Sequence, residues 1–265
     1  MDVNQFFINF RKPSCFYYAG DDYIESYKLK KKQIEKLDVF DHISIYNLQP
    51  GQFRDILDQT GEEPEIGIIL NSAHFIFNIL EFDRLPLREN LKRDLIEWRI
   101  KKVFPEEIDQ YEHHYFQLSK TRILSVLLKR ELKSKIESVV RETNRSLIYL
   151  GNSTVEIIND VFRGKDAPDF FLEIDKHLSI VVFQNHSIPY YIRKFRIEKG
   201  DDVMEELSKT LRYVSSSYGE SPKTYSLVSN MSDSSQRGIR EELEARELKE
   251  ITLANRGGLF LPILP

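Results

Sequence analysis

The sequence predicts a mixed α/β fold made of two similar halves, each with a β-sheet between helices. Residues 14–29 (SCFYYAGDDYIESYKL) follow a strand, tight turn, strand pattern, and residues 170–183 (FFLEIDKHLSIVVF) repeat it. A third strand ends in a turn within residues 223–230 (KTYSLVSN). Helical and strand-like segments alternate after each hairpin. A duplicated α/β architecture explains why the hairpin and the segments that follow it occur twice.

After the first hairpin, short apolar runs predict strands and amphipathic runs predict helices. The expected strands are residues 43–48, 65–71, 74–82, 114–118 and 122–128, and the expected helices are residues 52–59 and 131–143. The runs 65–71 and 74–82 are expected to pair with each other around Ser72 and Ala73. The first half would then combine several strands with flanking helices.

A further helix is expected between Pro86 and Phe104-Pro105, because the second proline cannot continue a helix. Apolar residues recur in this segment at helical spacing. They are Leu87, Leu91, Leu95 and Trp98. The spacing predicts one amphipathic helix with these side chains on a single face.

The second half repeats the theme with different elements. Its expected strands are residues 146–151, 170–173, 178–183, 188–196 and 225–228, and its expected helices are residues 153–162, 201–217 and 234–247. Three of these strands follow one another with only turn-forming residues between them, which predicts a meander. The boundary between the halves is expected within residues 144–169.

Composition and charge exclude several classes of protein. The chain has 265 residues, 41% of them apolar and 30% charged, so it can bury a substantial core. A formal net charge of −4, with both signs interspersed, gives no field that would attract nucleic acid. The single cysteine, Cys15, forms no disulfide within the chain, which fits a reducing cytoplasm. No signal-peptide pattern or membrane-spanning apolar run occurs, so membrane association is expected only through a partner.

One run of the sequence resembles a known family. Residues 81–118 (EFDRLPLRENLKRDLIEWRIKKVFPEEIDQYEHHYFQL) contain a Leu-Pro pair, a helical segment with a tryptophan, a Phe-Pro pair and an aromatic-rich strand. The positions that carry the pattern are Leu85-Pro86, Trp98, Phe104-Pro105 and Tyr115. The pattern is similar to that of PilM-type pilus-assembly proteins and of the cytoplasmic domain of the type II secretion protein GspL. The resemblance covers most of residues 14–253 and is most specific within residues 82–162.

The resemblance implies an actin-like, ribonuclease H-like fold, in which two α/β domains with mixed sheets flanked by helices surround a cleft. It places a first domain, which includes an inserted subdomain, at residues 1–145. A reduced second domain with an apolar C-terminal tail occupies residues 146–265. Only one helix fits between residues 199 and 225, so a subdomain that forms one wall of the family's nucleotide cleft would be reduced or absent.

Family members that bind ATP hold its phosphates with backbone N–H groups of two glycine-bearing hairpin turns, and aspartates order the magnesium ion. The first hairpin keeps Gly20, but Tyr18 stands at the position of the family's aspartate and offers no carboxylate to a metal. In the second hairpin the family's Asp-x-Gly reads Glu173-Ile174-Asp175. Asp175 would bring a negative charge to the phosphates, and two unit charges about 4 Å apart repel by roughly 4 kcal/mol at an effective dielectric constant of about 20.

The third nucleotide position also departs from the family, because the glycine pair beside the adenosine reads Ser229-Asn230. The resemblance therefore implies a degenerate nucleotide site, and we expect no ATP hydrolysis, no cofactor and no metal. Two alternatives stay open. The protein would be an ATP-binding actin-like enzyme with altered nucleotide motifs, or Tyr18, Glu173 and Asp175 would be plain turn residues if the alignment is shifted by one or two positions.

Other candidate catalytic or metal sites are weaker. His113 and His114 are adjacent in an expected strand, so their rings point to opposite faces and do not share one metal ion. Glu106, Glu107 and Asp109 follow a proline, and we interpret them as a solvated turn or helix start rather than as an acid/base pair. The sequence offers no set of residues for an enzyme of unrelated type.

What the resemblance implies for function is a cytoplasmic adaptor. PilM-type proteins capture the N-terminal cytoplasmic peptide of a single-pass membrane partner, PilN, and GspL recruits the secretion ATPase. We therefore expect a non-catalytic scaffold peripheral to the bacterial inner membrane, with a PilN-type partner, a motor ATPase as a second partner, and no nucleic acid. The apolar tail of residues 257–265 is expected to pack on its own domain, on a partner or on a second copy of the chain.

Overall fold

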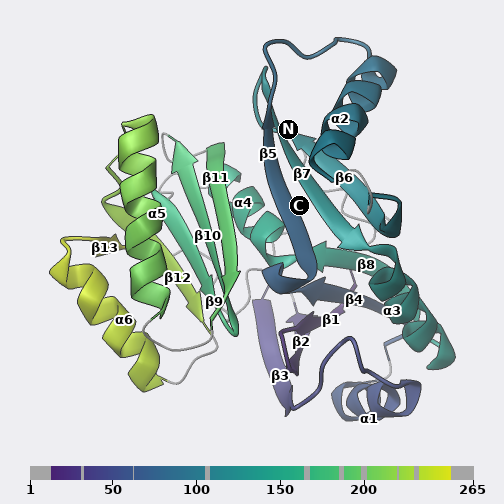
Figure 1. Ribbon diagram of the computed structural model, residues 1–265. Coiled ribbons are helices and arrows are strands. Elements are labelled where there is room, and N and C mark those ends of the chain that lie inside the picture. Colours follow the sequence, from purple (N-terminus) through teal and green to yellow (C-terminus); the bar gives the residue numbers. More distant parts are fainter. Residues whose placement is uncertain are drawn as a thin grey trace.

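Among the residues that the structure describes, the strands form two five-stranded sheets and one three-stranded sheet, with helices packed against them (Figure 1). This computed structural model describes residues 13–30, 33–61, 63–104, 108–163, 168–184, 188–197, 202–219, 221–229 and 233–251. In that part of the chain, no helix is both long enough and apolar enough to span a membrane.

The first five-stranded sheet is built around a central hairpin. Across the sheet, its strands are β3 (Gln33–Asp41), β2 (Tyr23–Lys30), β1 (Cys15–Ala19), β4 (Glu65–Leu70) and β8 (Ser146–Asn152). Strands β1, β2 and β3 are antiparallel neighbours, whereas β4 runs parallel to both β1 and β8. All five residues of β1 are buried, as expected for a strand covered on both faces. Helices α1 (Pro50–Thr60) and α3 (Arg130–Glu142) pack on one face.

The second five-stranded sheet repeats this arrangement. Across it, the strands are β11 (Ile188–Arg196), β10 (His177–Gln184), β9 (Phe170–Ile174), β12 (Thr224–Ser229) and β13 (Lys249–Glu250). Strands β9, β10 and β11 form the predicted meander, and β12 runs parallel to β9. Helices α5 (Asp202–Tyr218) and α6 (Asp233–Ala245) pack on this sheet. Because both sheets have the same strand order and directions, the predicted duplication of mixed sheets is confirmed.

A three-stranded antiparallel sheet is inserted between β4 and β8. Its strands, in order, are β5 (Phe75–Glu81), β7 (Arg122–Lys129) and β6 (Tyr111–Gln117). Helix α2 (Glu89–Val103) packs on one face of it, and the short helices η1 (Ser72–His74) and η2 (Ile108–Gln110) lie in its connections. We call the first sheet, this inserted sheet and α1 to α3 the first lobe, and the second sheet with α5 and α6 the second lobe.

Helix α4 (Ser153–Arg163) joins the two lobes. It follows β8 of the first lobe and precedes β9 of the second. Its buried side chains Val155 and Ile158 belong to a core cluster that contains Tyr17 of β1 together with Phe171 and Val181 of the second sheet. One hydrophobic core therefore continues from the first lobe into the second.

The expected pairing of residues 65–71 with residues 74–82 is wrong. Strand β4 pairs with β1 and β8, whereas β5 pairs with β7 in the inserted sheet. Helix η1 turns the chain between them, and Asn71 caps it by accepting a hydrogen bond from the backbone N–H of Ala73 at 3.2 Å. Two consecutive apolar strands therefore belong to different sheets, because the capped turn redirects the second one.

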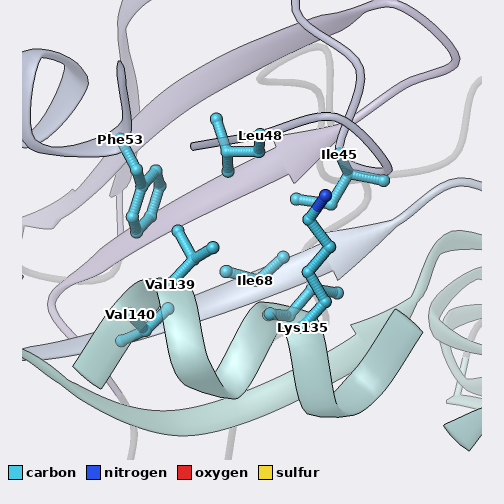
Figure 2. Close-up of a pocket in the computed structure, with 8 residues that line it drawn as sticks. Ile45, Leu48, Phe53, Ile68, Lys135, Val139 and Val140 are labelled. Carbon is cyan, nitrogen blue, oxygen red and sulfur yellow. The ribbon is translucent and has the colours of Figure 1, made fainter. Parts of the chain in front are cut away.

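The expected strand at residues 43–48 is also wrong, because this segment forms turns. Its apolar residues Ile45 and Leu48 are instead buried beside Phe53 of α1 and Ile68 of β4 (Figure 2). The space between these side chains leaves no room for a water molecule. Apolar spacing alone did not separate a strand from a loop that contributes side chains to the core.

The sequence analysis missed β3, which pairs with β2 at the edge of the first sheet. Its residues QIEKLDVFD include several charged side chains between the apolar ones, and charged side chains on an edge strand discourage pairing with other chains. The predicted domain boundary after residue 145 also falls directly before β8. Since β8 hydrogen-bonds to β4, the first sheet extends to Asn152, and we propose that the first domain ends beyond that residue.

Helix α2 forms where it was expected, but most of the predicted apolar face does not point into the core. Its fully buried side chains are Ile96 and Ile100, while Leu91 and Trp98 are exposed. The aliphatic part of Lys92 is also buried, and its ammonium group donates to Glu89 at 2.6 Å and to Gln117 at 3.0 Å. The helix therefore packs mainly through the side that carries Ile96 and Ile100, while Leu95 of the predicted face packs at the margin of this core.

Candidate functional site

The turns of the two central hairpins face each other between the lobes. The β1–β2 turn contains Asp21 and Asp22, and the β9–β10 turn contains Asp175 and Lys176. The ammonium group of Lys176 donates to Asp22 Oδ2 at 2.5 Å. Both of these side chains are partly exposed, so this ion pair contributes at most about 1 kcal/mol. The ion pair nevertheless holds Lys176 of the β9–β10 turn against Asp22 of the β1–β2 turn.

Asp175 places its carboxylate against the first turn. The backbone N–H of Asp21 donates to Asp175 Oδ2 at 3.2 Å, and Asn71 Nδ2 lies 3.5 Å from the same oxygen. Burial raises the pKa of Asp175, and the nearby negative charge of Asp21 raises it further. A carboxylate oxygen of the second turn thus accepts a backbone N–H of the first, and backbone N–H groups in turns are a common type of anion donor.

Asp21 is held from the other side by the second hairpin. His177 Nδ1 lies 3.0 Å and 3.1 Å from the two carboxylate oxygens of Asp21, so this ring nitrogen donates its proton. Burial acts to raise the pKa of Asp21, but the contacts with His177, His74 and Asn71 together outweigh burial, and the pKa is lowered. The ionised form of Asp21 is therefore stabilised at the contact between the lobes.

Glu173 lies deeper, on β9, and its side chain is only 3% exposed. Oε1 accepts hydrogen bonds from the hydroxyl groups of Tyr18 at 3.1 Å and Ser153 at 2.6 Å, and Oε2 accepts from Thr154 at 3.4 Å. Burial raises the pKa of Glu173. Since Tyr18 is in β1 and the two other donors begin α4, this one carboxyl group connects the central strand of the first sheet, α4 and the second sheet.

Lys194 makes a further polar contact between the lobes, and His74 makes one within the first lobe. Lys194 extends from β11, and its ammonium group donates to the carbonyl oxygens of Ser72, Ala73 and Phe75 at 3.2, 2.9 and 2.6 Å. Burial lowers its pKa. His74 Nε2 lies 3.4 Å from the carbonyl oxygen of Gly20, and burial lowers the pKa of His74 to about 4. A neutral His74 therefore donates to the first turn.

The structure gives Gly20 a packing role. A Cβ atom at this position would lie 2.1 Å from the ring of Tyr23, far closer than such atoms approach in proteins. The backbone N–H of Gly20 also donates to the carbonyl of Tyr23 at 3.0 Å, which closes the turn. The glycine is therefore required by the neighbouring tyrosine ring, whether or not a phosphate ever approaches it.

We expect Gly20→Ala to lower the free energy of unfolding by about 1–3 kcal/mol, because the added methyl group forces the Tyr23 ring or the turn to move. Urea denaturation measures this change. Gly51→Ala is the matched control: Gly51 lies in α1 with nothing within 4 Å of a built Cβ, so the variant should be as stable as the wild type or more stable. Equal stability of the Gly20 variant and the wild type would contradict the packing role.

Of the two residues at the third predicted nucleotide position, the structure describes Ser229. Ser229 ends β12 and stands opposite Ile174 in the strand register, next to Glu173. Its carbonyl accepts a hydrogen bond from Gln236 Nε2 at 3.1 Å. Asn230 lies outside the described residues, as do Glu106, Glu107 and the tail from residue 252 onward. The described residues between β11 and β12 form α5 alone, as expected from the short spacing.

The two adjacent histidines have separate partners, as expected from a strand. His113 Nε2 lies 3.2 Å from the hydroxyl of Ser125, whereas His114 Nε2 lies 3.0 Å from Glu112. Among the residues that the structure describes, no group of three or more His, Cys, Asp or Glu side chains is arranged to hold a metal ion.

Comparison with known proteins places this geometry in a recognised fold. The sequence matches no known family model and no curated protein. The structure is similar to that of a PilM-PilN type IV pilus biogenesis complex, with a TM-score of 0.70 and 12% identity over 91% of this chain and 89% of that chain. A Bacteroides thetaiotaomicron protein, described as having an actin-like ATPase fold and unknown function, gives a TM-score of 0.59 at 11% identity over 93% and 94% of the two chains. The chain has an actin-like fold.

A third similar structure is the cytoplasmic domain of EpsL, an inner-membrane component of the type II secretion system of Vibrio cholerae. Its TM-score is 0.56 at 7% identity, over 83% of this chain and 83% of that chain. The expected likeness to PilM and to the GspL type of secretion protein is therefore confirmed at the level of the fold.

In this actin-like fold, several of the residues predicted from the sequence come together. Tyr18 bonds to Glu173, and Asp175 meets the turn that starts at Gly20. The sequence analysis missed most of the residues that connect the two lobes. They are Asp21, Asp22, Asn71, Ser153, Thr154, Lys176, His177 and Lys194. A signal for some of them was present, since two acids follow Gly20 while a lysine and a histidine follow Asp175.

Proposed function

We propose that this protein is a non-catalytic cytoplasmic scaffold of a bacterial type IV pilus, type II secretion or related envelope machine. It would capture a cytoplasmic peptide of a single-pass inner-membrane partner of PilN type, with a motor ATPase as a second partner. The protein would lie peripheral to the inner membrane. The actin-like fold and its likeness to a PilM-PilN complex support this proposal.

One observation carries the non-catalytic part of the proposal. The backbone N–H of Asp21 already donates to the carboxylate of Asp175, so a side chain of the protein holds the position that a phosphate oxygen would need. A triphosphate would have to displace this carboxylate and also separate His177 from Asp21. Each displaced buried polar group would cost about 1–3 kcal/mol unless the nucleotide replaced its hydrogen bond.

Titration calorimetry with Mg-ATP tests this part. We expect no saturable binding below about 1 mM, which corresponds to less than about 4 kcal/mol of binding free energy. Saturable binding that disappears in Asp175→Lys, but persists in the charge-matched surface variant Asp58→Lys, would instead favour an ATP-binding enzyme with altered motifs. Asp58 is an exposed residue of α1, away from the two turns.

The adaptor part has a separate test. A peptide copied from the N-terminal cytoplasmic segment of a single-pass protein encoded beside this one should bind with the same affinity whether Mg-ATP is present or absent. A scrambled peptide of the same composition is the control. Absence of binding by every such neighbouring peptide would contradict the capture of a PilN-type partner, and it would leave the result of the nucleotide titration untouched.

The aromatic segments of the inserted sheet do not provide open pockets for such a peptide. Phe75 is buried, and Phe77 and Phe116 pack against the main core, while Tyr115 packs with the residues under α2. Among the described residues the inserted sheet has two edge strands, β5 and β6, and β5 lies beside β11 of the second lobe. Main-chain pairing along β6 is therefore the mode of peptide binding that this sheet offers.

A further inference from the structure

Helix α2 is apolar on two opposite sides. Ile96 and Ile100 are buried against the inserted sheet. Half a turn away, Leu91 is 48% exposed and Trp98 is 50% exposed, and Leu87, just before the helix, is 92% exposed. Leu91 and Trp98 share one face because they lie seven positions apart in the helix, and Leu87 lines the same hollow as Leu91. Large apolar side chains gathered on one exposed helix face mark a surface that contacts another molecule.

The segment that carries this face is strongly basic. Residues 84–103 contain seven basic and three acidic residues, a net charge of +4, although the whole chain has a net charge of −4. The basic residues are Arg84, Arg88, Lys92, Arg93, Arg99, Lys101 and Lys102. All of them except the buried Lys92 are exposed. Positive charge is therefore concentrated on the part of an acidic protein that also exposes leucine and tryptophan.

The basic side chains border the apolar face directly. Lys102 Nζ lies 3.9 Å from the centroid of the Trp98 ring, and by helical geometry Arg88 and Lys101 fall on the two sides of the Leu91–Trp98 line. The same geometry places one acid, the exposed Asp94, between Trp98 and Lys101. At the N-terminal end of the helix, an open hollow of about 340 Å³ carries two arginines on an apolar lining. The lining residues are Arg84, Leu85, Pro86, Leu87, Arg88 and Leu91.

We propose that this α2 surface, made of Leu87, Arg88, Leu91, Trp98, Lys101 and Lys102, binds directly to an anionic phospholipid bilayer. Exposed leucine and tryptophan would enter the interfacial layer, and the flanking basic side chains would pair with lipid phosphates, as in helices that lie in the plane of a membrane. A second copy of the same surface is a poor occupant, because two faces of net positive charge repel each other.

The position of α2 allows such contact. Figure 1 shows α2 at the outer side of the inserted sheet, opposite α5 and α6 of the second lobe, so a broad flat surface can approach the helix without meeting that lobe. The proposal goes beyond the scaffold function, in which the membrane is reached only through a partner. It gives the protein a second, direct attachment that orients the first lobe toward the membrane.

The single tryptophan of the chain is Trp98, so tryptophan fluorescence, excited at a wavelength that tyrosine does not absorb, reports on this surface. The full chain is mixed with vesicles of phosphatidylcholine containing phosphatidylglycerol, and with vesicles of phosphatidylcholine only, at physiological salt. We expect a blue shift of the emission and flotation of the protein with the anionic vesicles only. Absence of both effects, or equal binding to the two kinds of vesicle, would overturn the proposal.

Charge reversal tests which surface is used. Lys101→Glu/Lys102→Glu should weaken binding to the anionic vesicles by at least about 30-fold, the loss typical of two basic side chains near an anionic membrane. Lys223→Glu/Lys249→Glu, on exposed residues of the second lobe, is the charge-matched control and should bind like the wild type. Flotation is the measurement, because it does not depend on the Lys102 contact with Trp98. If the first variant retains full binding, or if both variants lose it equally, α2 is not the surface used.

Discussion

Glu173→Ala is expected to lower the free energy of unfolding by about 3 kcal/mol. The carboxyl group accepts hydrogen bonds from Tyr18, Ser153 and Thr154, and its removal leaves three buried hydroxyl groups without this acceptor. An unsatisfied buried polar group costs about 1–3 kcal/mol, and the loss is offset in part because a buried carboxyl group is itself costly. Urea denaturation at neutral pH measures the difference. The slope of the unfolding free energy against urea concentration should be the same for the variant and the wild type.

Two further variants separate the hydrogen bonds from the charge. Glu173→Gln keeps one acceptor oxygen in the same shape and should cost about 1 kcal/mol. Glu112→Ala removes a partly exposed carboxylate that pairs with Lys133 at 2.7 Å within the first lobe, and should cost about 1 kcal/mol or less. If Glu173→Ala were no more damaging than Glu112→Ala, the carboxyl group would not be a main connection between the lobes.

The second large expected effect is a decrease in the free energy of unfolding in mild acid, caused by protonation of His74. Its pKa is lowered from 6.5 in the unfolded chain to about 4 in the folded protein, chiefly because the ring is buried. Between these two values the unfolded chain binds a proton that the folded protein does not, so stability falls as the pH is lowered from 6.5 to about 4. The shift corresponds to about 3 kcal/mol over this range. Denaturation of the wild type and of His74→Gln across the range measures it.

The comparison between the two proteins isolates this histidine. Asp21, Lys194 and His177 face His74, and they are present in both. The raised pKa values of Glu173 and Asp175 act in the opposite direction, because the folded protein gains stability as these carboxyl groups become protonated. These two carboxyl groups contribute equally to the stability of the wild type and of His74→Gln, so their contribution cancels when the two stabilities are subtracted. The curves should therefore approach each other as the pH falls, and parallel curves would show that His74 does not carry the effect.

The fold was predictable because its signals are local. The tight turn at Gly20 and the similar turn at Asp175 each lie between two strand-like runs, and a hairpin is specified by such neighbours in sequence. The highly charged edge strand β3 gave no such signal, and the loop containing Ile45 gave a false one. Apolar residues report burial, but they do not report the backbone conformation that achieves it.

The candidate site was predictable only in part, because its contacts are distant in sequence. Tyr18 and Glu173 were identified from motif positions, yet their hydrogen bond joins residues in different sheets. The attachment of Asp21 to His177 depends on how the lobes pack, which no spacing rule supplies. The α2 face shows the same difficulty, since two opposite apolar sides were present and only packing decides that Ile96 points inward while Trp98 points outward.

The bonds between the hairpin turns have a consequence for how such a scaffold would respond to the cell. In a nucleotide-driven protein of this architecture, the angle between the halves would follow the supply of fuel. Here Asp21, Asp175 and Lys194 make the connection from within the chain. In the proposed scaffold, a partner would therefore meet the same docking geometry at low and at high nucleotide concentration, and any timing of assembly would have to come from the proposed motor partner or from the membrane.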